Sequence, residues 1–220
     1  MTIDDASADP ALVPSTPTDS NARTLAVYEA HAEQYAEQTE SSGSIAHRTF
    51  LRRLARVSPP GEVLEVGSAQ GRDAAYLEQH GRRVRRTDGS RAFVAMLRSQ
   101  GHDADVLNLL TDDLIDTTHG PYAAVLANAV LLHFTPNELS LVLAKIAGAL
   151  VPGGVLGFSV KVGDGTEWSD HKLGVPRFYQ YWRGEPLQER VEAAGFVDVD
   201  LELDDGAPWS WYFVVARTPG

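Results

Sequence analysis

One short stretch of the chain, from Val63 to Asp73, limits the possible folds more than any other. An apolar run ends at Val66, a turn of small residues follows, and a helical pattern begins at once. This order of strand, tight loop and helix N-terminus is typical of sites that bind nucleotide-like ligands. Gly67 and Gly71 permit backbone angles that a side chain would forbid, and they let a ligand approach the main chain closely. We therefore expect a ligand to bind at this loop.

Strands and helices alternate after this loop. Apolar runs bounded by turn residues predict strands over 84–88, 105–108, 122–128 and 155–160, and helical spacing predicts helices over 73–80, 90–100 and 135–150. The run over 122–128 is almost wholly apolar, as expected of a central parallel strand that is buried on both faces. After a last helix around Leu187, two strands over 197–203 and 209–216 follow without an intervening helix. This ending predicts a hairpin.

Length and composition favour a single soluble domain. The 220 residues suffice for one sizeable core, and the formal net charge of −11 disfavours nucleic acid as a partner. The chain has no cysteine, which excludes disulfides and thiolate metal sites. Because we find neither a membrane-spanning apolar run nor a secretory signal, we expect no membrane association and a cytoplasmic location.

The chain divides into a tail, a helical cap and a core. Residues 1–20 carry little apolar periodicity and are expected to be disordered, so that 21–220 forms the domain. Within it we expect a helical cap over 21–58 and a core over 62–217. The irregular, aromatic-rich segment 162–184 is expected to be a lid-like insertion that helps bind a ligand.

Spaced motifs in a fixed order carry a family resemblance. The first is an acid followed by small residues, Glu65 with Gly67, Ala69 and Gly71; the family's middle glycine is alanine here, which permits a tight turn if its backbone angle is ordinary. The second is Asp88, 21 residues after Gly67, and the third is the turn Leu150–Gly154. Over residues 24–217 the chain resembles the class I S-adenosylmethionine (SAM) dependent methyltransferases. The resemblance implies a Rossmann-like α/β fold with a seven-stranded, mostly parallel sheet, an antiparallel last strand, helices on both faces and an N-terminal helical cap.

The resemblance also implies a set of residues that bind SAM. Asp88 would accept hydrogen bonds from the ribose hydroxyls, and Asn108 or Leu109 would meet the adenine. Asn128 ends a central strand, and Tyr35 closes an A-x-x-Y pattern whose tyrosine often reaches SAM in similar enzymes. Arg72 either meets the SAM carboxylate or is a plain surface residue. The full set is Tyr35, Glu65, Gly67, Ser68, Ala69, Gly71, Arg72, Asp88, Asn108, Leu109 and Asn128.

Several residues are candidates for handling the methyl acceptor. His133 is either a general base or a structural residue that satisfies nearby backbone groups. Glu167 and His171 are further candidate bases, needed only if the acceptor must lose a proton. Tyr28, Lys161, Arg177 and Tyr181 are candidate acceptor-binding residues. We expect no metal, because Asp164, Asp170 and His171 lie on no regular scaffold.

Two other functions remain open. An NAD(P)-dependent oxidoreductase would share the fold, but its third glycine position is occupied here by Arg72. A non-catalytic SAM-binding protein would keep the cofactor loop without an open acceptor pocket. The favoured function is transfer of a methyl group to an oxygen, nitrogen or activated carbon of a small, partly apolar molecule such as a natural-product intermediate. The protein is expected to be a monomer or a homodimer.

Overall fold

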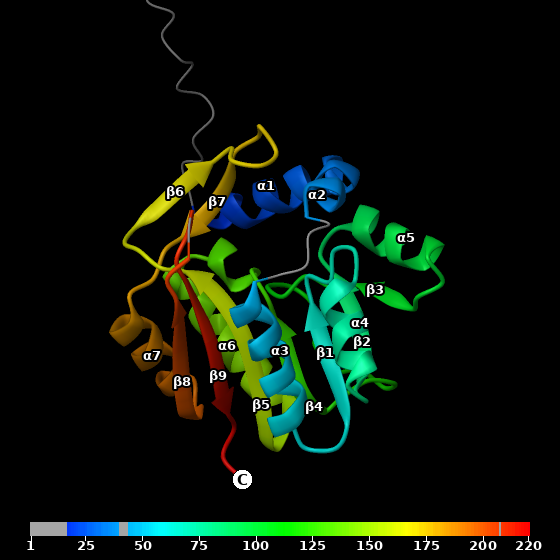
Figure 1. Ribbon diagram of the computed structural model, residues 1–220, viewed down its shortest axis with the longest axis vertical. Helices are drawn as coiled ribbons and strands as arrows, with labels where there is room; N and C mark the ends of the chain where they lie inside the picture. Colours follow the sequence, from blue (N-terminus) through cyan, green and yellow to red (C-terminus); the bar gives the residue numbers. More distant parts are fainter. Residues whose placement is uncertain (1–16, 40–43, 207) are drawn as a thin grey trace, which may run out of the picture.

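The computed structural model describes residues 17–39, 44–206 and 208–220. Within them, one sheet of seven strands has the order β3-β2-β1-β4-β5-β9-β8 (Figure 1). The strands β3, β2, β1, β4 and β5 pair in parallel, and β9 runs antiparallel to both β5 and β8. Their bounds are β1 Glu62–Val66, β2 Arg83–Asp88, β3 Ala104–Val106, β4 Tyr122–Ala127, β5 Leu150–Lys161, β8 Val197–Asp204 and β9 Trp211–Arg217. The expected Rossmann-like sheet with an antiparallel last strand is confirmed.

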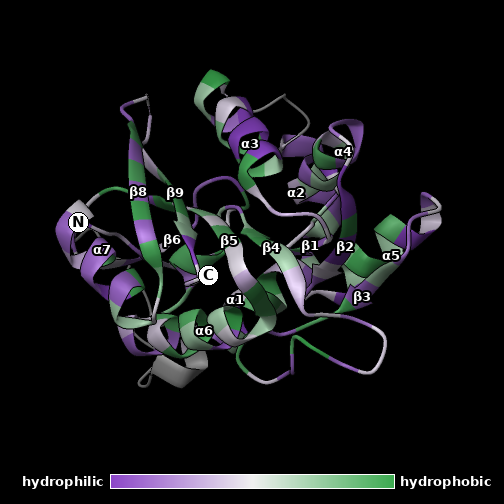
Figure 2. Cartoon of the chain, turned by 90° about the horizontal axis from the view of Figure 1, so that it is seen from below, coloured by the Kyte–Doolittle hydropathy of each residue, from purple (hydrophilic) through white to green (hydrophobic). Residues whose placement is uncertain are grey.

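Helices cover both faces of this sheet (Figure 2). Leu54 of α3 and Leu77 of α4 are buried in one apolar cluster on the first face, and Leu143 of α6 and Val191 of α7 are buried in another on the second. Burying a side chain of this size contributes about 1.5–3 kcal/mol. The bounds are α3 Ile45–Val57, α4 Arg72–Gln79, α5 Arg91–Ser99, α6 Pro136–Ala149 and α7 Gly184–Ala193, with a 3₁₀ turn, η2, at Leu131–His133.

Two helices and a small hairpin form a cap over the carboxyl ends of the parallel strands (Figure 1). These are α1 (Pro17–Ala30), α2 (Ala32–Gln38), and the antiparallel pair β6 (Thr166–Ser169) and β7 (Arg177–Gln180). The Thr24 hydroxyl of α1 accepts a hydrogen bond from the Phe178 amide of β7. Glu29 of α1 accepts hydrogen bonds from the Ser90 hydroxyl and the Ala92 amide at the start of α5. The first contact joins α1 to the hairpin within the cap, and the second ties the cap to the core.

Three details differ from the sequence expectations. Helix α1 begins at Pro17, so the last residues of the expected tail 1–20 are helical, while residues 1–16 lie outside the described residues. The segment expected to be irregular contains the β6–β7 hairpin. In β8 a bulge that the sequence does not predict follows Val197; Asp198 there has φ 51°, and Val197 is exposed.

Candidate functional site

The loop between β1 and α4 has the left-handed backbone that its glycines suggest. Gly67 has φ 69°, and a Cβ atom there would lie 2.4 Å from a Val130 methyl group. Gly71 has φ 80° and caps the N-terminus of α4. Ala69 also has a left-handed backbone, with φ 47°. The expectation of an ordinary angle at Ala69 is therefore wrong, and this alanine has a conformation that costs an L-residue roughly 1–2 kcal/mol.

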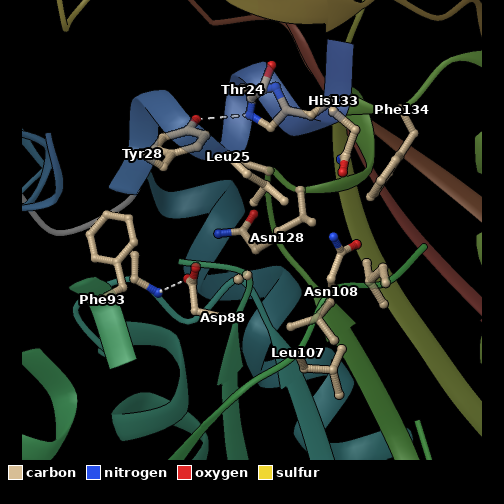
Figure 3. Close-up of a pocket in the computed structure, with 18 of the residues that line it drawn as sticks. Thr24, Leu25, Tyr28, Asp88, Phe93, Leu107, Asn108, Asn128, His133 and Phe134 are labelled. Atoms are coloured by element: carbon tan, nitrogen blue, oxygen red, sulfur yellow. Dashed lines mark hydrogen bonds between the residues drawn. The ribbon is translucent and has the colours of Figure 1, made fainter. Parts of the chain in front are cut away.

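A first cavity of about 100 Å³ lies beside this loop and under the cap (Figure 3). Its core side is formed by the ends of β1, β2 and β4 and by the loop after β3. Its cap side is formed by α1 and Tyr35. The lining residues are Asn21, Thr24, Leu25, Tyr28, Tyr35, Val66, Gly67, Ala69, Asp88, Gly89, Phe93, Leu107, Asn108, Leu109, Asn128, Ala129, Val130, His133 and Phe134.

Asp88, the last residue of β2, places its carboxylate at this cavity. One oxygen accepts a hydrogen bond from the Ala69 amide at 2.9 Å, and the other accepts one from the Ser90 amide at 2.8 Å. The residue is 7% exposed, and burial raises the pKa of its carboxyl to about 6. Each carboxylate oxygen can accept a second hydrogen bond, so the group can still receive the two hydroxyls of a ribose.

The loop after β3 forms the far end of the first cavity. The side-chain oxygen of Asn108 accepts a hydrogen bond from the Leu110 amide at 3.0 Å. The Asn108 amide in turn donates to Asp112 at 2.9 Å, and the Leu109 carbonyl accepts from Lys145. The loop is held from both sides. The Asn108 side chain keeps one lone pair on its oxygen and its NH₂ group for a ligand.

A second cavity of about 430 Å³ adjoins the first and shares part of its lining with it. The shared residues are Tyr35, Val66, Gly67, Ala69, Asn128 and Ala129. The two cavities therefore meet at the Gly67–Ala69 loop. Beyond the loop, the second cavity reaches α3, α4, the end of β5 and the segment that joins β8 to β9.

Buried carboxylates and polar side chains line the second cavity. Glu65 accepts a hydrogen bond from the Ser68 hydroxyl, and burial, together with repulsion from Asp73, raises the pKa of Glu65 to about 8. Burial opposes ionisation of Asp73 as well, but hydrogen bonds from His47 and Asn128 outweigh it and hold the pKa of Asp73 below its usual value. The Asn128 oxygen accepts from the Ser159 hydroxyl at 2.6 Å. Negative charge is thus available at this end of the site.

His133 stands in a chain of hydrogen bonds beneath the cap. Its Nδ1 lies 2.6 Å from the Phe178 carbonyl, which can only accept, so Nδ1 carries the proton. Its Nε2 accepts from the Tyr28 hydroxyl at 2.9 Å, and that hydroxyl accepts from Arg177 at 3.0 Å. Burial, with repulsion from Arg177 and Lys161, lowers the pKa of His133 to about 3. A neutral His133 with both nitrogens engaged fits the structural role better than that of a base.

The two cavities gather most of the residues expected to bind a cofactor. All of them line one cavity or both except Gly71, which lies at the start of α4. Arg72 lines the second cavity and donates a hydrogen bond to the Thr39 carbonyl, which ties the core to the end of α2.

The residues expected to handle an acceptor are less tightly grouped. Tyr28 and His133 line the first cavity. Lys161, Arg177 and Tyr181 line neither but lie close to the wall, as described below. Glu167 is exposed on β6 and accepts a hydrogen bond from Tyr181, and His171 is exposed on the turn after β6. The structure does not bring these two candidate bases to the cavities.

Sequence reasoning did not identify several residues of the site. Thr24, Leu25 and Phe93 line the first cavity, and His47, Asp73, Ser159, Lys172 and Trp209 line the second. Asp73 and Ser159 could have been found, since each lies at the site end of an expected element. The others come from the cap and the β8–β9 connection, whose position over the sheet depends on tertiary contacts.

The fold and the site together define a Rossmann-like domain with a nucleotide-type groove at the carboxyl ends of its strands. Residues 64–156 match the family model described as a methyltransferase domain. This segment is therefore similar to a methyltransferase domain, which confirms the resemblance drawn from the sequence motifs. No curated protein matches the sequence.

Solved structures of similar fold cover nearly the whole chain. The 1,6-didemethyltoxoflavin-N1-methyltransferase of Burkholderia thailandensis, bound to 1,6-didemethyltoxoflavin and S-adenosylhomocysteine (SAH), is 20% identical, with 100% of this chain and 99% of that chain covered and a TM-score of 0.67. A DhpI–SAH complex is 22% identical, with 93% and 99% covered and a TM-score of 0.71. The [4+2]-cyclase SpnF is 18% identical, with 94% and 98% covered and a TM-score of 0.67. At these identities the likeness establishes the fold.

Two features are absent from the described residues. None of their helices combines the length and the apolar character needed to cross a membrane. No three or more of their His, Asp and Glu side chains are grouped so as to hold a metal ion.

Proposed function

We propose that this protein transfers the methyl group of SAM to an oxygen, nitrogen or activated carbon of a small molecule. The observation that carries the proposal is the placement of Asp88 beside the Gly67–Ala69 loop, at the point where two adjoining cavities meet the carboxyl ends of the strands. The match of residues 64–156 to a methyltransferase domain supports it. Two similar structures that contain bound SAH support it as well.

The residues present suit the parts of SAM. In the proposed arrangement Asp88 accepts the ribose hydroxyls, and Asn108 and Leu109 meet the adenine among the apolar side chains of the first cavity. Asp73 offers negative charge to the amino group of the methionine part, Glu65 can accept a hydrogen bond from that group, and Arg72 offers positive charge to the methionine carboxylate.

The main requirement of the reaction is alignment of the acceptor atom with the methyl group of SAM. SAM supplies a methyl group that its positive sulfur has already activated. The protein needs to hold the acceptor atom in line with this methyl group, and orientation of reactants can contribute about 7–11 kcal/mol. Tyr35 and Asn128 line both cavities, and so stand between the places proposed for the adenosine and methionine parts of SAM, where its methyl group would lie.

A general base belongs to the proposal only for acceptors that must lose a proton. His133 has both ring nitrogens engaged and a strongly lowered pKa, so we assign it the positioning of Tyr28 instead. Glu167 and His171 stay candidates only if the β6–β7 hairpin moves, since both lie outside the two cavities.

Methyl transfer is tested directly with SAM that carries a labelled methyl group. The protein is incubated with it and with pooled small metabolites, and labelled products are separated by chromatography. Labelled product that depends on the protein is expected. The similar structure of SpnF is that of a [4+2]-cyclase, so this fold alone does not establish methyl transfer. A protein that binds SAM and SAH but labels no compound would point to the non-catalytic alternative.

The oxidoreductase alternative is tested by binding. Separate titrations of SAH and NADH into the protein by calorimetry are expected to give heat with SAH alone. Binding of NADH without SAH would replace the proposed function. Neither the family match nor the similar structures described above support a nicotinamide cofactor.

A further inference from the structure

Three cationic side chains converge on the wall of the site without acidic partners. They are Lys161 at the end of β5, Lys172 in the turn between β6 and β7, and Arg177 at the start of β7. Lys161 is 6% exposed and Arg177 is 2% exposed. No ion pair joins any of the three to a carboxylate anywhere in the described part of the chain.

Aromatic rings hold these cations in place of carboxylates. The Lys161 ammonium lies 4.3 Å from the centre of the Tyr179 ring and 4.0 Å from the centre of the Trp209 ring. The Arg177 guanidinium flanks the same Tyr179 ring at 5.5 Å. Such cation–π contacts stabilise a partly buried cation without neutralising its charge.

The cations repel one another. Burial and the charges of Arg177 and Lys172 lower the pKa of Lys161 to about 8, and only the charge of Glu167 acts in the other direction. Burial and the charges of Arg177 and Arg72 also lower the pKa of Lys172. The Nε atom of Arg177 is buried and has no hydrogen-bond partner. Buried like charges with an unused donor are costly unless an anion joins them.

The charge of this cluster is opposite in sign to the net charge of the whole chain. The protein has 30 acidic and 19 basic residues, and only three of the basic residues are lysines, of which Lys161 and Lys172 are two. The cluster also adjoins the site. Lys172 and Trp209 line the second cavity, and Tyr28, which accepts a hydrogen bond from Arg177, lines the first. Ser159 lines the second cavity two residues before Lys161 on the same strand face.

We propose that Lys161, Lys172 and Arg177 bind an acidic group of the methyl acceptor, so that the substrate is a small aromatic or partly apolar molecule carrying a carboxylate or a phosphate. This inference rests on the proposed function, because it assigns the acceptor of the same site. Charge-assisted hydrogen bonds to ammonium and guanidinium groups would hold the acidic group, and the rings of Tyr35, Tyr179 and Trp209 would contact the apolar part.

The test compares acids with neutral molecules of the same shape. Benzoate, phenyl phosphate and benzamide are titrated by calorimetry into protein that is saturated with SAH. At least one of the two acids is expected to bind about ten-fold or more tightly than benzamide, and which acid binds distinguishes a carboxylate site from a phosphate site. Equal affinity for acids and benzamide, or no binding by any of the three, would overturn the inference.

Variants separate this site from the donor site. Lys161→Met keeps the length of the side chain and removes its charge. It is expected to lower the affinity for the preferred acid about ten-fold and to leave the affinity for SAH unchanged. Lys161→Arg should restore most of the acid binding. Arg83→Met, which removes a charge from a side chain that is 79% exposed, is the matched control and should change neither affinity.

The outcomes separate the inference from the proposed function. If Lys161→Met lowers the affinity for SAH instead of the affinity for the acid, the cluster is part of the donor site and the inference fails. If the wild-type protein binds no SAH, the proposed function fails. The acids are then titrated into the free protein, where a preference for acids that Lys161→Met removes would still support an anion site.

Discussion

Ala69 has a left-handed backbone at a position where a glycine would be relaxed. Replacing it with glycine relieves roughly 1–2 kcal/mol of strain. It also adds unfolded-chain entropy that costs about 0.4–1 kcal/mol. We expect Ala69→Gly to stabilise the protein by about 0.5–1 kcal/mol in urea unfolding. A loss of stability would contradict the left-handed angle. Ala95→Gly, a change on the exposed face of α5, should destabilise the protein as usual for a helix.

Glu65 ties stability to pH because burial raises the pKa of its carboxyl to about 8. The folded protein therefore holds this proton more tightly than the unfolded chain does. The contribution to stability is fully present below the unfolded pKa of about 4.5 and is lost as the pH rises through about 8.

Glu65→Gln removes this titration while keeping the size of the side chain. The unfolding free energy of the variant minus that of the wild type should therefore rise by more than about 1 kcal/mol from about pH 5 to about pH 9. Urea unfolding at several pH values measures the difference, since the other titrating groups are common to both proteins. The same pH slope in both proteins would show that Glu65 ionises normally.

The cap depends on a small number of contacts between elements, and the Thr24 hydroxyl is one of them. It accepts the buried Phe178 amide, and so fixes α1 of the cap to the β6–β7 hairpin. Thr24→Val leaves that amide without an acceptor, at a cost of about 1–3 kcal/mol. Because α1 also lines the first cavity, we expect both lower thermal stability and weaker SAH binding.

The control for this change is Thr117→Val in the exposed loop before β4. It alters the same chemical group away from the cap and should leave both properties unchanged. If Thr24→Val lowers stability but not SAH affinity, α1 does not shape the donor site.

Which elements could be predicted from the sequence follows from how local their causes are. Ser90 and the capping box at Thr135 fix their helices by contacts within a few residues, and both caps are present in the structure. The β6–β7 hairpin was missed, because its strands have only four residues each and its pairing depends on packing against α1.

The same reasoning explains which site residues were found. Asp88 ends β2 and Asn128 directly follows β4. Because the carboxyl ends of parallel strands meet at one edge, the proximity of these residues follows from the order of the strands. Lys172 and Trp209 come from connections whose position no periodicity encodes. The angle at Ala69 was also misjudged, since the turn geometry outweighs the preference of an alanine.

At the level of the whole molecule, the sheet brings segments far apart in the chain to one groove. The loop after β1, the end of β2, the loop after β3 and the end of β4 all open toward the same cap (Figure 1). A strongly acidic chain nevertheless carries, beside that groove, a cluster of three cations that form no ion pair with a carboxylate of the described residues. Position and charge together point to a donor that binds at the loop and an anionic acceptor beside it.

Calorimetric titration of SAH into the wild-type protein and into Asp88→Asn tests this account most directly. Asp88→Asn removes the charge-assisted hydrogen bonds to the ribose and should lower the affinity for SAH about ten-fold to one-hundred-fold. Asp103→Asn, an exposed change before β3, is the control, and thermal unfolding checks that every variant is folded. Saturable SAH binding by the wild type that Asp88→Asn weakens and Asp103→Asn leaves intact is the predicted result. No SAH binding by folded wild-type protein, or equal affinity in Asp88→Asn, would contradict the account.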